Sequence, residues 1–496
     1  MNPLRFPILI AFLAGLLSAT GFAPLDLWPV TLLAVAMLIH LVRGASGIGR
    51  ALLIGWVFGL GNFVVGLNWI ATAFTYQAAM PAWLGWVAVL LLSLYLAVYP
   101  AIACGLAWRF GRGRALDFAL LFAANWMLGE WLRATIFTGF AWNPLGVILV
   151  DVAAGQYGSW IGTYGLGGVV ILTGAAVLAL LELRRWRKAL VVPFLLLFAL
   201  DLRVAHPDTA SGRHIRIVQA NIAQQDKWRE GFETINFERL ARLTGRPGGA
   251  PRLILWPEVA VPDYLEEEPE ARRRIAALIG PGDVLLTGGI AVAYDAQGNA
   301  VAARNSLFAL DAGGRILARA DKSHLVPYGE YLPMRPLLSM IGLSRLAPGD
   351  IDFLAGPGPQ TIALPGFGRA GIQICYEIIF SGHVVDRADR PDFLFNPSND
   401  AWFGAWGPPQ HLAQARLRAM EEGLPVIRAT PTGISAVVDA DGRLIESLPW
   451  RREGVIETRL PRPGPPTPFA RLGNLLPALF GLGLIAVTIA MRFRRR

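Results

Sequence analysis

The stretch Gly371-Ile372-Gln373-Ile374-Cys375-Tyr376-Glu377 decides how the polar part of this chain is interpreted. It has the pattern of a short buried strand that ends at a cysteine, and Cys375 is one of only two cysteines in 496 residues. Open α/β sheets gather their reacting groups at strand ends, so Cys375 is a candidate nucleophile. The other thiol, Cys104, lies in an apolar run, where a small buried hydrophobe is the ordinary interpretation, and no disulfide between the two is expected.

The composition is that of a membrane protein. Of all residues, 54% are hydrophobic and 16% are charged, and several apolar runs are long enough to cross about 30 Å of hydrocarbon at about 1.5 Å per residue. Seven transmembrane helices are predicted before residue 205 and an eighth near the C-terminus, at 6–23, 27–42, 51–74, 82–108, 115–137, 154–182, 189–202 and 473–491. The first run could instead be a removable signal peptide, but further spans follow it at once, which favours a retained helix.

The net charge of +9 would suit nucleic-acid binding, but the positions of the basic residues indicate a membrane topology instead. Arginine and lysine gather in every second connection between predicted helices and after the last one, whereas residues 21–27 and 75–81 contain neither. By the positive-inside rule, both termini are cytoplasmic. The segment from about 205 to 470 follows seven spans and is therefore predicted on the outer face. In a bacterium this would be the periplasmic face of the inner membrane.

The outer segment, residues 206–465, is long enough to fold around a core of its own. It alternates short, often β-branched runs such as 252–256 with helix-like stretches such as 410–422, which predicts an α/β sandwich. The predicted organisation is a membrane domain of seven helices over 1–205, an extracytoplasmic domain over 206–465, and a C-terminal transmembrane helix with a basic cytoplasmic tail over 466–496.

Three residues of the outer segment form a chemical set: Glu258 and Cys375 each follow a strand-like run, and Lys322 lies at a third predicted strand end. A thiol needs a base or a lowered pKa before it attacks a carbonyl, and a carboxylate can take its proton. An ammonium group nearby stabilises both the thiolate and an oxyanion on the substrate. Taken singly, Glu258 could equally cap a helix, Lys322 could be a solvated charge and Cys375 could be a core residue.

The residues around this set resemble a known family. The motifs are Trp256-Pro257-Glu258, Lys322 followed by Pro327-Tyr328-Gly329-Glu330-Tyr331-Leu332-Pro333, Cys375-Tyr376-Glu377, and Ser398-Asn399-Asp400-Ala401-Trp402-Phe403-Gly404. Together they resemble the nitrilase superfamily, whose Glu-Lys-Cys triad lies in an α-β-β-α sandwich, and within it the apolipoprotein N-acyltransferases. That family also places such a domain between its seventh and eighth membrane helices, so the resemblance covers nearly the whole chain.

The resemblance implies a role for each matching position. Glu258 would be the general base, Lys322 the oxyanion stabiliser and Cys375 the nucleophile. Six further positions would support the triad or contact substrate: Glu330, Tyr376, Glu377, Trp228, Asn305 and Trp402. For Trp228 and Trp402, packing is an equal alternative to lipid contact. The chain departs from the family pattern at Pro431-Thr432, where two asparagines are expected, which affects fine substrate contacts rather than the triad.

The implied reaction is a two-step acyl transfer between lipids. Cys375 would take an acyl chain from a phospholipid, phosphatidylethanolamine being the expected donor, and hold it as a thioester. The α-amine of a diacylglyceryl-modified N-terminal cysteine on an apolipoprotein would then accept the chain, which is the final step of bacterial lipoprotein maturation. Partners are thus the bilayer, the phospholipid and the apolipoprotein, with no nucleic acid.

No cofactor or metal is expected, because the six histidines show no close pair at ligand spacing and no Cys-x-x-Cys occurs. Two other classes stay open. A membrane-tethered nitrilase-type amidase would use the same triad with water as the second nucleophile. A transporter with an extracytoplasmic receptor domain would explain the helices but gives the Glu-Lys-Cys set no purpose.

Two features are left open by the sequence. Glu130 and Arg133 lie three residues apart in a predicted span, where they could pair structurally or serve a lipid head group. Residues 331–358 are too apolar for a solvated loop and too short for a span, so they form either a buried helix or a lid beside the site.

Overall fold

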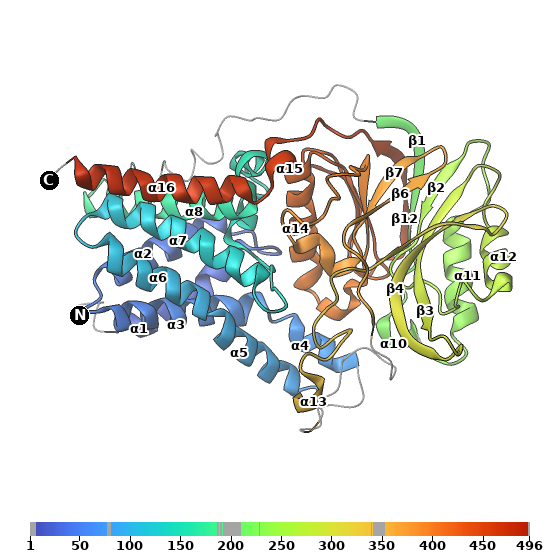
Figure 1. The fold of residues 1–496 in the computed structure, drawn as a ribbon, viewed down its shortest axis with the longest axis horizontal. Helices are drawn as coiled ribbons and strands as arrows, with labels where there is room; N and C mark the ends of the chain where they lie inside the picture. The colour runs from blue at the N-terminus through green and yellow to red at the C-terminus, as the bar shows by residue number, and fades with distance from the viewer. Residues whose placement is uncertain are drawn as a thin grey trace. The chain divides into compact units, whose positions relative to one another are not determined.

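A computed structural model describes residues 6–76, 81–185, 188, 191, 210–227, 229–338, 340 and 353–494. The chain divides into two compact units (Figure 1). The first unit contains residues 1–71, 83–204 and 466–496, and the second contains residues 72–82 and 205–465. Residues 72–82, which begin inside the end of the third predicted span, thus belong with the unit that holds the sheets.

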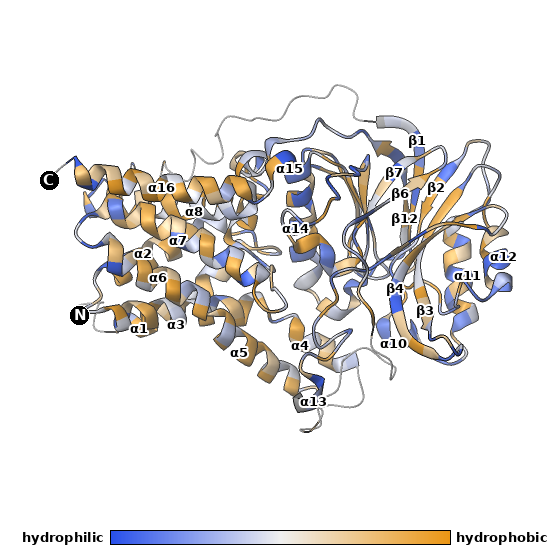
Figure 2. Ribbon diagram, viewed as in Figure 1, coloured by the Kyte–Doolittle hydropathy of each residue, from blue (hydrophilic) through white to orange (hydrophobic). Residues whose placement is uncertain are grey.

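The first unit is helical. Its longer helices are α1 (Pro7–Ser18), α2 (Trp28–Arg43), α3 (Ile48–Gly66), α5 (Leu84–Leu96), α6 (Val98–Gly111), α7 (Ala115–Thr135), α8 (Gly158–Glu182) and α16 (Leu475–Phe493). Short helices α4 (Ile70–Ala73) and α15 (Pro468–Leu472) precede α5 and α16. Proline near the first position starts both α1 and α2, where its missing N–H costs nothing. Figure 2 shows these helices largely in the colour of apolar residues.

The helices of this unit have the lengths and surfaces of membrane segments. Within the described residues, four stretches are long and apolar enough to cross a membrane: Ile48–Gly66, Leu84–Gly111, Ala153–Glu182 and Leu475–Phe493. The stretches Pro7–Gly21 and Trp28–Arg43 are apolar but shorter. Leucines such as Leu91 and Leu482 are about 60% exposed, which suits contact with lipid rather than with water.

The predicted spans and the helices differ at several ends. The span predicted over 51–74 ends at Gly66, because the chain turns there and continues only as the short helix α4. The span predicted over 82–108 consists of two helices, α5 and α6, that meet at Ala97. The span predicted at 115–137 is α7, which carries three charged side chains and is not among the four apolar stretches. The span predicted at 189–202 lies outside the described residues, apart from residue 191.

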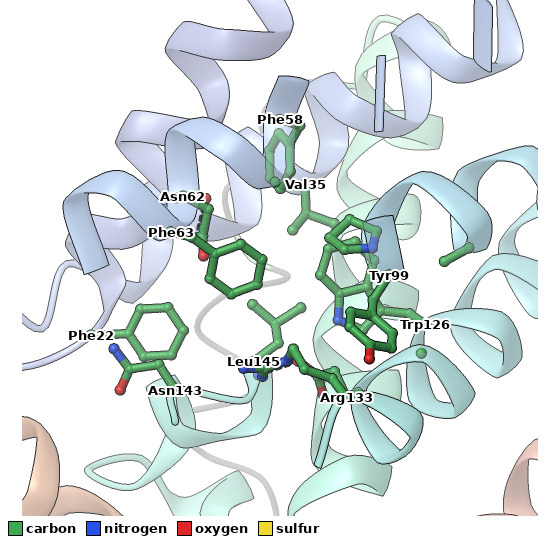
Figure 3. Close-up of a pocket in the computed structure, with 16 residues that line it drawn as sticks. Phe22, Val35, Phe58, Asn62, Phe63, Tyr99, Trp126, Arg133, Asn143 and Leu145 are labelled. Atoms are coloured by element: carbon green, nitrogen blue, oxygen red, sulfur yellow. Dashed lines mark hydrogen bonds between the residues drawn. The ribbon is translucent and has the colours of Figure 1, made fainter. Parts of the chain in front are cut away.

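Glu130 and Arg133 lie on α7 and bind the backbone of the segment that follows this helix. Leu145 N–H donates to the Glu130 carboxylate at 2.6 Å, and the Arg133 guanidinium donates to the carbonyls of Phe140 and Trp142 at 3.1 and 2.8 Å. Both side chains line a cavity between the helices, which Figure 3 shows with aromatic neighbours including Phe58, Phe63, Tyr99 and Trp126. The hydrogen bonds to the main chain favour the structural role over the head-group role.

The second unit contains two mixed sheets. In the first, the order is β12-β1-β2-β3-β4-β5, and in the second it is β11-β10-β9-β8-β7-β6. The strands of the first sheet are β1 (Ala210–Gln219), β2 (Arg252–Leu255), β3 (Val284–Tyr294), β4 (Ala300–Asp311), β5 (Ile316–Asp321) and β12 (Gly454–Pro461). Those of the second are β6 (Gln360–Leu364), β7 (Gly368–Ile372), β8 (Phe393–Pro397), β9 (Val426–Ala429), β10 (Ser435–Val438) and β11 (Leu444–Leu448).

Each sheet has a parallel centre, β1-β2-β3 in one and β7-β8-β9 in the other, with antiparallel strands outside it. Helices α11 (Glu233–Thr244) and α12 (Pro269–Ala276) pack on the first sheet, where Leu240 and Ile275 meet Ile254, Leu285 and Phe308 in one core. Helix α14 (Gly407–Glu422) covers the second sheet (Figure 1). This arrangement confirms the predicted α-β-β-α sandwich.

Candidate functional site

Cys375 lies where strand β7 gives way to a short 3-10 helix, Cys375–Ile379. Its φ is +54°, in the left-handed region that side chains other than glycine seldom adopt, and the residue is buried. Such strain persists only where neighbouring contacts hold it, and it clusters at active sites.

Glu377 supplies part of that hold. One carboxylate oxygen accepts from Ile374 N–H at 2.7 Å. The other accepts from Ser323 N–H at 2.7 Å, from the Ser323 hydroxyl at 2.6 Å and from His324 N–H at 2.9 Å. The residues Ser323 and His324 directly follow Lys322 in sequence. Glu377 therefore ties the turn that carries the thiol to the segment that carries the lysine.

Glu258 comes three residues after β2, in a turn that fits closely against β3. Val259 has a φ of +43°, and a Cβ on Gly288 would lie 2.3 Å from Val259 N and 2.7 Å from Glu258 Cα. Only glycine fits at that point of β3. The Glu258 side chain is 6% exposed and accepts from Asn305 Nδ2 at 2.8 Å.

Lys322 follows β5 and is 2% exposed. Its Nζ donates to Glu330 Oε1 at 2.9 Å and lies 3.6 Å from Glu258 Oε1. The amide Nδ2 of Asn305 donates to both carboxylates, at 2.8 Å to Glu258 and 3.0 Å to Glu330. Two acids, one lysine and one amide thus form a single buried cluster, and the structure brings four sequence-predicted residues together in it.

Cys375 belongs to the same electrostatic environment. Burial, followed by the charge of Glu258, raises the pKa of the Cys375 thiol to about 12, against an opposing effect of Lys322. The thiol is therefore protonated at neutral pH, so it must lose its proton before it can react. For Lys322, burial acts to lower the pKa, but Glu330, Glu258 and Cys375 outweigh it and raise the pKa above its ordinary range. Lys322 is accordingly a fixed positive charge.

The aromatic residues predicted from the sequence have mixed outcomes. Tyr376 is buried, with its ring 5.2 Å from Phe380 and 5.8 Å from the ring of His324. Trp402 is half-buried and packs edge to face on Tyr76, 5.8 Å between centroids. Trp228 lies outside the described residues. Roles in lipid contact for these three side chains stay predictions.

Part of the apolar segment 331–358 is described. Leu332 is buried, Met334 is 64% exposed and residues 335–338 form α13 (Arg335–Leu338). Residues 339 and 341–352 lie outside the described residues, so the choice between a buried helix and a lid stays a prediction.

Lys227, at the end of α10 (Gln224–Lys227), is a second lysine at the site that sequence reasoning missed. Its Nζ donates to the Glu258 carbonyl at 3.0 Å, and burial lowers its pKa to about 8 against the charges of Glu258 and Cys375. Lys227 and Glu258 line a cavity with Pro431, one of the two residues that depart from the family pattern. The only sequence signal was its position next to Trp228.

Sequence reasoning also missed a group of buried polar residues behind Cys375: Asn396, Asp400, His411 and Arg428. Asp400 stood inside a quoted motif without a role, and the other three have no local signal. As for metals, no group of three or more His, Cys, Asp or Glu side chains in the described part of the chain is arranged to hold an ion.

Both units of the chain match known protein families. The model of the apolipoprotein N-acyltransferase N-terminal domain matches residues 14–176, and the carbon-nitrogen hydrolase model matches residues 214–464. An apolipoprotein N-acyltransferase of Bradyrhizobium diazoefficiens is 37% identical, covering 98% of this chain and 95% of the relative. The chain belongs to the apolipoprotein N-acyltransferase family. The family protein of Rhodopseudomonas palustris is 35% identical over the same shares of the two chains.

Among solved structures, Nit3 of Saccharomyces cerevisiae, a member of branch 10 of the nitrilase superfamily, matches 51% of this chain and 92% of its own, with 18% identity and a TM-score of 0.35. Membership of the apolipoprotein N-acyltransferase family rests on the full-length relatives and confirms the resemblance found in the sequence motifs. With its apolar helices, this family member is a membrane-embedded enzyme.

Proposed function

We propose that this chain transfers an acyl chain from a phospholipid to the N-terminal amine of an apolipoprotein, through a thioester on Cys375. The observation that carries the proposal is the buried cluster beside the thiol. Glu258 Oε1 and Lys322 Nζ lie 3.6 Å apart, and the charges of both residues affect the pKa of the Cys375 thiol. Full-length relatives named apolipoprotein N-acyltransferase support the choice of substrates.

In the first step, the Glu258 carboxylate takes the thiol proton and the Cys375 thiolate attacks the ester carbonyl of the phospholipid. The oxyanion that forms is stabilised by the Lys322 ammonium. Collapse of this intermediate breaks the ester bond, and the lysophospholipid leaves with the proton that Glu258 held. The products are a thioester and a lysophospholipid, and the carboxylate is restored.

In the second step, the free α-amine of the diacylglyceryl cysteine attacks the thioester carbonyl. Glu258 takes a proton from the attacking nitrogen and passes it to the departing thiolate, so that an amide forms and the thiol returns. Lys322 again lies where negative charge develops on oxygen. One base and one cation therefore serve both half-reactions.

Both substrates carry long acyl chains, and moving such chains into water costs about 0.8 kcal/mol per CH₂. The proposed site accordingly works at the membrane face, with phosphatidylethanolamine as the donor. The basic connections between helices support cytoplasmic termini and a catalytic domain on the periplasmic side of the inner membrane.

The test uses the full chain in detergent-lipid micelles with a phospholipid labelled in its acyl chain. Mass spectrometry should find one labelled acyl group on Cys375, and a diacylglyceryl peptide added next should carry it away as an amide. The Cys375→Ala variant should bind no label. Release of free fatty acid without transfer to the peptide would favour the membrane-tethered hydrolase, and no labelled protein at all would refute the proposal.

A further inference from the structure

Two buried side chains contact the carbonyl oxygen of Cys375 within hydrogen-bond distance. His411 Nε2 lies 3.1 Å from it and Asn396 Nδ2 donates to it at 3.2 Å. Asn396 belongs to β8 and His411 to α14, so elements distant in sequence meet at the nucleophile. Asn396 Nδ2 also donates to the carbonyl of Gln373 at 2.6 Å.

These two side chains are linked to each other by a buried ion pair. Arg428 on β9 donates to Asn396 Oδ1 and to both carboxylate oxygens of Asp400. Nδ1 of His411 lies 3.0 Å from the Arg428 guanidinium and 3.1 Å from Asp400 Oδ1. The contacts form a closed ring that starts and ends at the Cys375 carbonyl, and its four side chains are all 0% exposed.

The chemistry of the ring determines which atom of His411 carries the proton. A carbonyl oxygen only accepts, so Nε2 of His411 donates to Cys375. Burial, followed by the charge of Arg428, lowers the pKa of His411, so the imidazole stays neutral and its Nδ1 accepts from Arg428. Arg428 is in turn balanced by Asp400. Burial acts to raise the pKa of Asp400, but the charge of Arg428 and its hydrogen bonds to the carboxylate outweigh burial and hold that pKa below its ordinary range.

The backbone leaves room for this ring at Gly433. A Cβ there would lie 2.5 Å from Asp400 Oδ2, so any larger residue would displace the carboxylate. The hydroxyl of Ser398 also donates to Asp400, at 2.8 Å. A buried polar network with this many mutual hydrogen bonds rigidifies its surroundings.

We propose that His411, with Asp400 and Arg428 behind it, is a positioning residue that holds the strained backbone of Cys375. The hydrogen bond from Nε2 to the Cys375 carbonyl stabilises the φ of +54° and thereby keeps Sγ in reach of Glu258 and Lys322. The inference rests on the proposed role of Cys375 as nucleophile. His411 itself touches no substrate.

Two variants of His411 distinguish the effect of its hydrogen-bond donor from the effect of its side-chain volume. His411→Leu fills similar space without a donor, and His411→Gln keeps an amide N–H that can reach the carbonyl. At saturating phospholipid, His411→Leu should form acyl-enzyme at least about tenfold more slowly per folded molecule, the scale of a small misplacement, while His411→Gln stays within about threefold. The half-saturating phospholipid concentration should change little in either variant.

The control is Asp283→Asn, which disturbs a buried pair with Arg252 at the far end of β2 from Glu258. It should lower the melting temperature but leave the rate per folded molecule unchanged. Three results would overturn the inference. His411→Leu could form acyl-enzyme as fast as the wild type, His411→Gln could be slowed as much as His411→Leu, or only the half-saturating phospholipid concentration could change. Alkylation of Cys375 by iodoacetamide is measured in parallel, because it reports on the thiol without needing the proposed substrate. If the wild type is not acylated at all, the proposed function fails. Slower alkylation of His411→Leu than of the wild type and His411→Gln would still support the positioning role of His411.

Discussion

Replacing Glu258 by glutamine should change the reactivity of Cys375 in two opposite directions. Glu258 is one of the charges that raise the pKa of the thiol, so a neutral amide at this position lowers that pKa. More thiolate is then present at a given pH, and alkylation by iodoacetamide becomes faster. Acylation by phospholipid becomes slower, because the group proposed to take the thiol proton and return it to the leaving lysophospholipid is lost.

The structure sets the size of both effects. A thiol with a pKa of about 12 is ionised in roughly one molecule in 10⁴ at pH 8, and each unit by which its pKa falls raises that fraction about tenfold. Losing a general base costs about 10²- to 10⁴-fold in acylation. Folding should survive, because the substituted amide retains an oxygen for Asn305 and Lys322 keeps its hydrogen bond to Glu330 at 2.9 Å.

The Lys322→Met substitution should change the alkylation rate of Cys375 in the opposite direction. Lys322 lowers the pKa of the thiol, so its loss should slow alkylation as well as acylation. It also leaves Glu258 and Glu330 buried without their cation, and breaking a buried pair in this way costs about 3–5 kcal/mol. Both variants are therefore compared per folded molecule.

The assay follows alkylation and acylation of the full chain by mass spectrometry from pH 7 to pH 10. The matched control is Glu446→Gln, an exposed glutamate on β11 of the same unit, which should change neither rate. Slower alkylation in Glu258→Gln, or acylation as fast as in the wild type, would show that the assigned roles are wrong.

Three other measurements test the same structure. Since burial raises the folded-state pKa of Cys375 above its unfolded value, this thiol should lower stability as pH rises above about 9, by about 1.4 kcal/mol at pH 10, and in a melting series the stability of Cys375→Ala should fall by that much less. Glu377→Gln should lower stability by about 1–3 kcal/mol and slow acylation, because an amide cannot accept all the donors that the carboxylate accepts; an unchanged melting temperature would contradict this. In a background without native thiols, Gln297→Cys should react with an impermeant maleimide added to whole cells and Ser46→Cys should not, and the reverse labelling would overturn the proposed topology.

The sequence was sufficient to predict the sandwich and to single out Glu258, Lys322 and Cys375 as one set. Each of the three comes shortly after the carboxyl end of a strand, which is where α/β sheets gather their reacting groups. The bridging position of Asn305 could not be derived in this way. It depends on the pairing of β3 with β4, which sets Asn305 opposite Ile290, and on the segment that returns Glu330 to the same place. Register over such distances leaves no local trace in the sequence.

The network behind Cys375 was hidden for a different reason. His411 lies on a helix whose buried face also carries ordinary core residues such as Leu417, so its periodicity indicates burial rather than function. Only the packing of α14 against β9 shows that Arg428 contacts His411, and that the same guanidinium reaches Asn396. In the helical unit, Gly66 ended α3 earlier than predicted because hydropathy alone does not distinguish a continued helix from an apolar turn.

The second glutamate beside Lys322 has a reason in the proposed mechanism. When Glu258 takes the proton from Cys375, Lys322 loses one of its two counter-charges just as an oxyanion begins to form. Glu330, at 2.9 Å and tied to Val326 N–H at 2.8 Å, remains as a fixed anion and keeps the buried lysine charged through that step. The thiol proton meanwhile passes between groups inside the cluster, so the net charge of the protein groups does not change when the nucleophile forms. A site with Glu258 alone would leave Lys322 with no fixed anion at this step, only the charge that moves from the thiolate to the oxyanion, and burial would then act more strongly in favour of the neutral lysine.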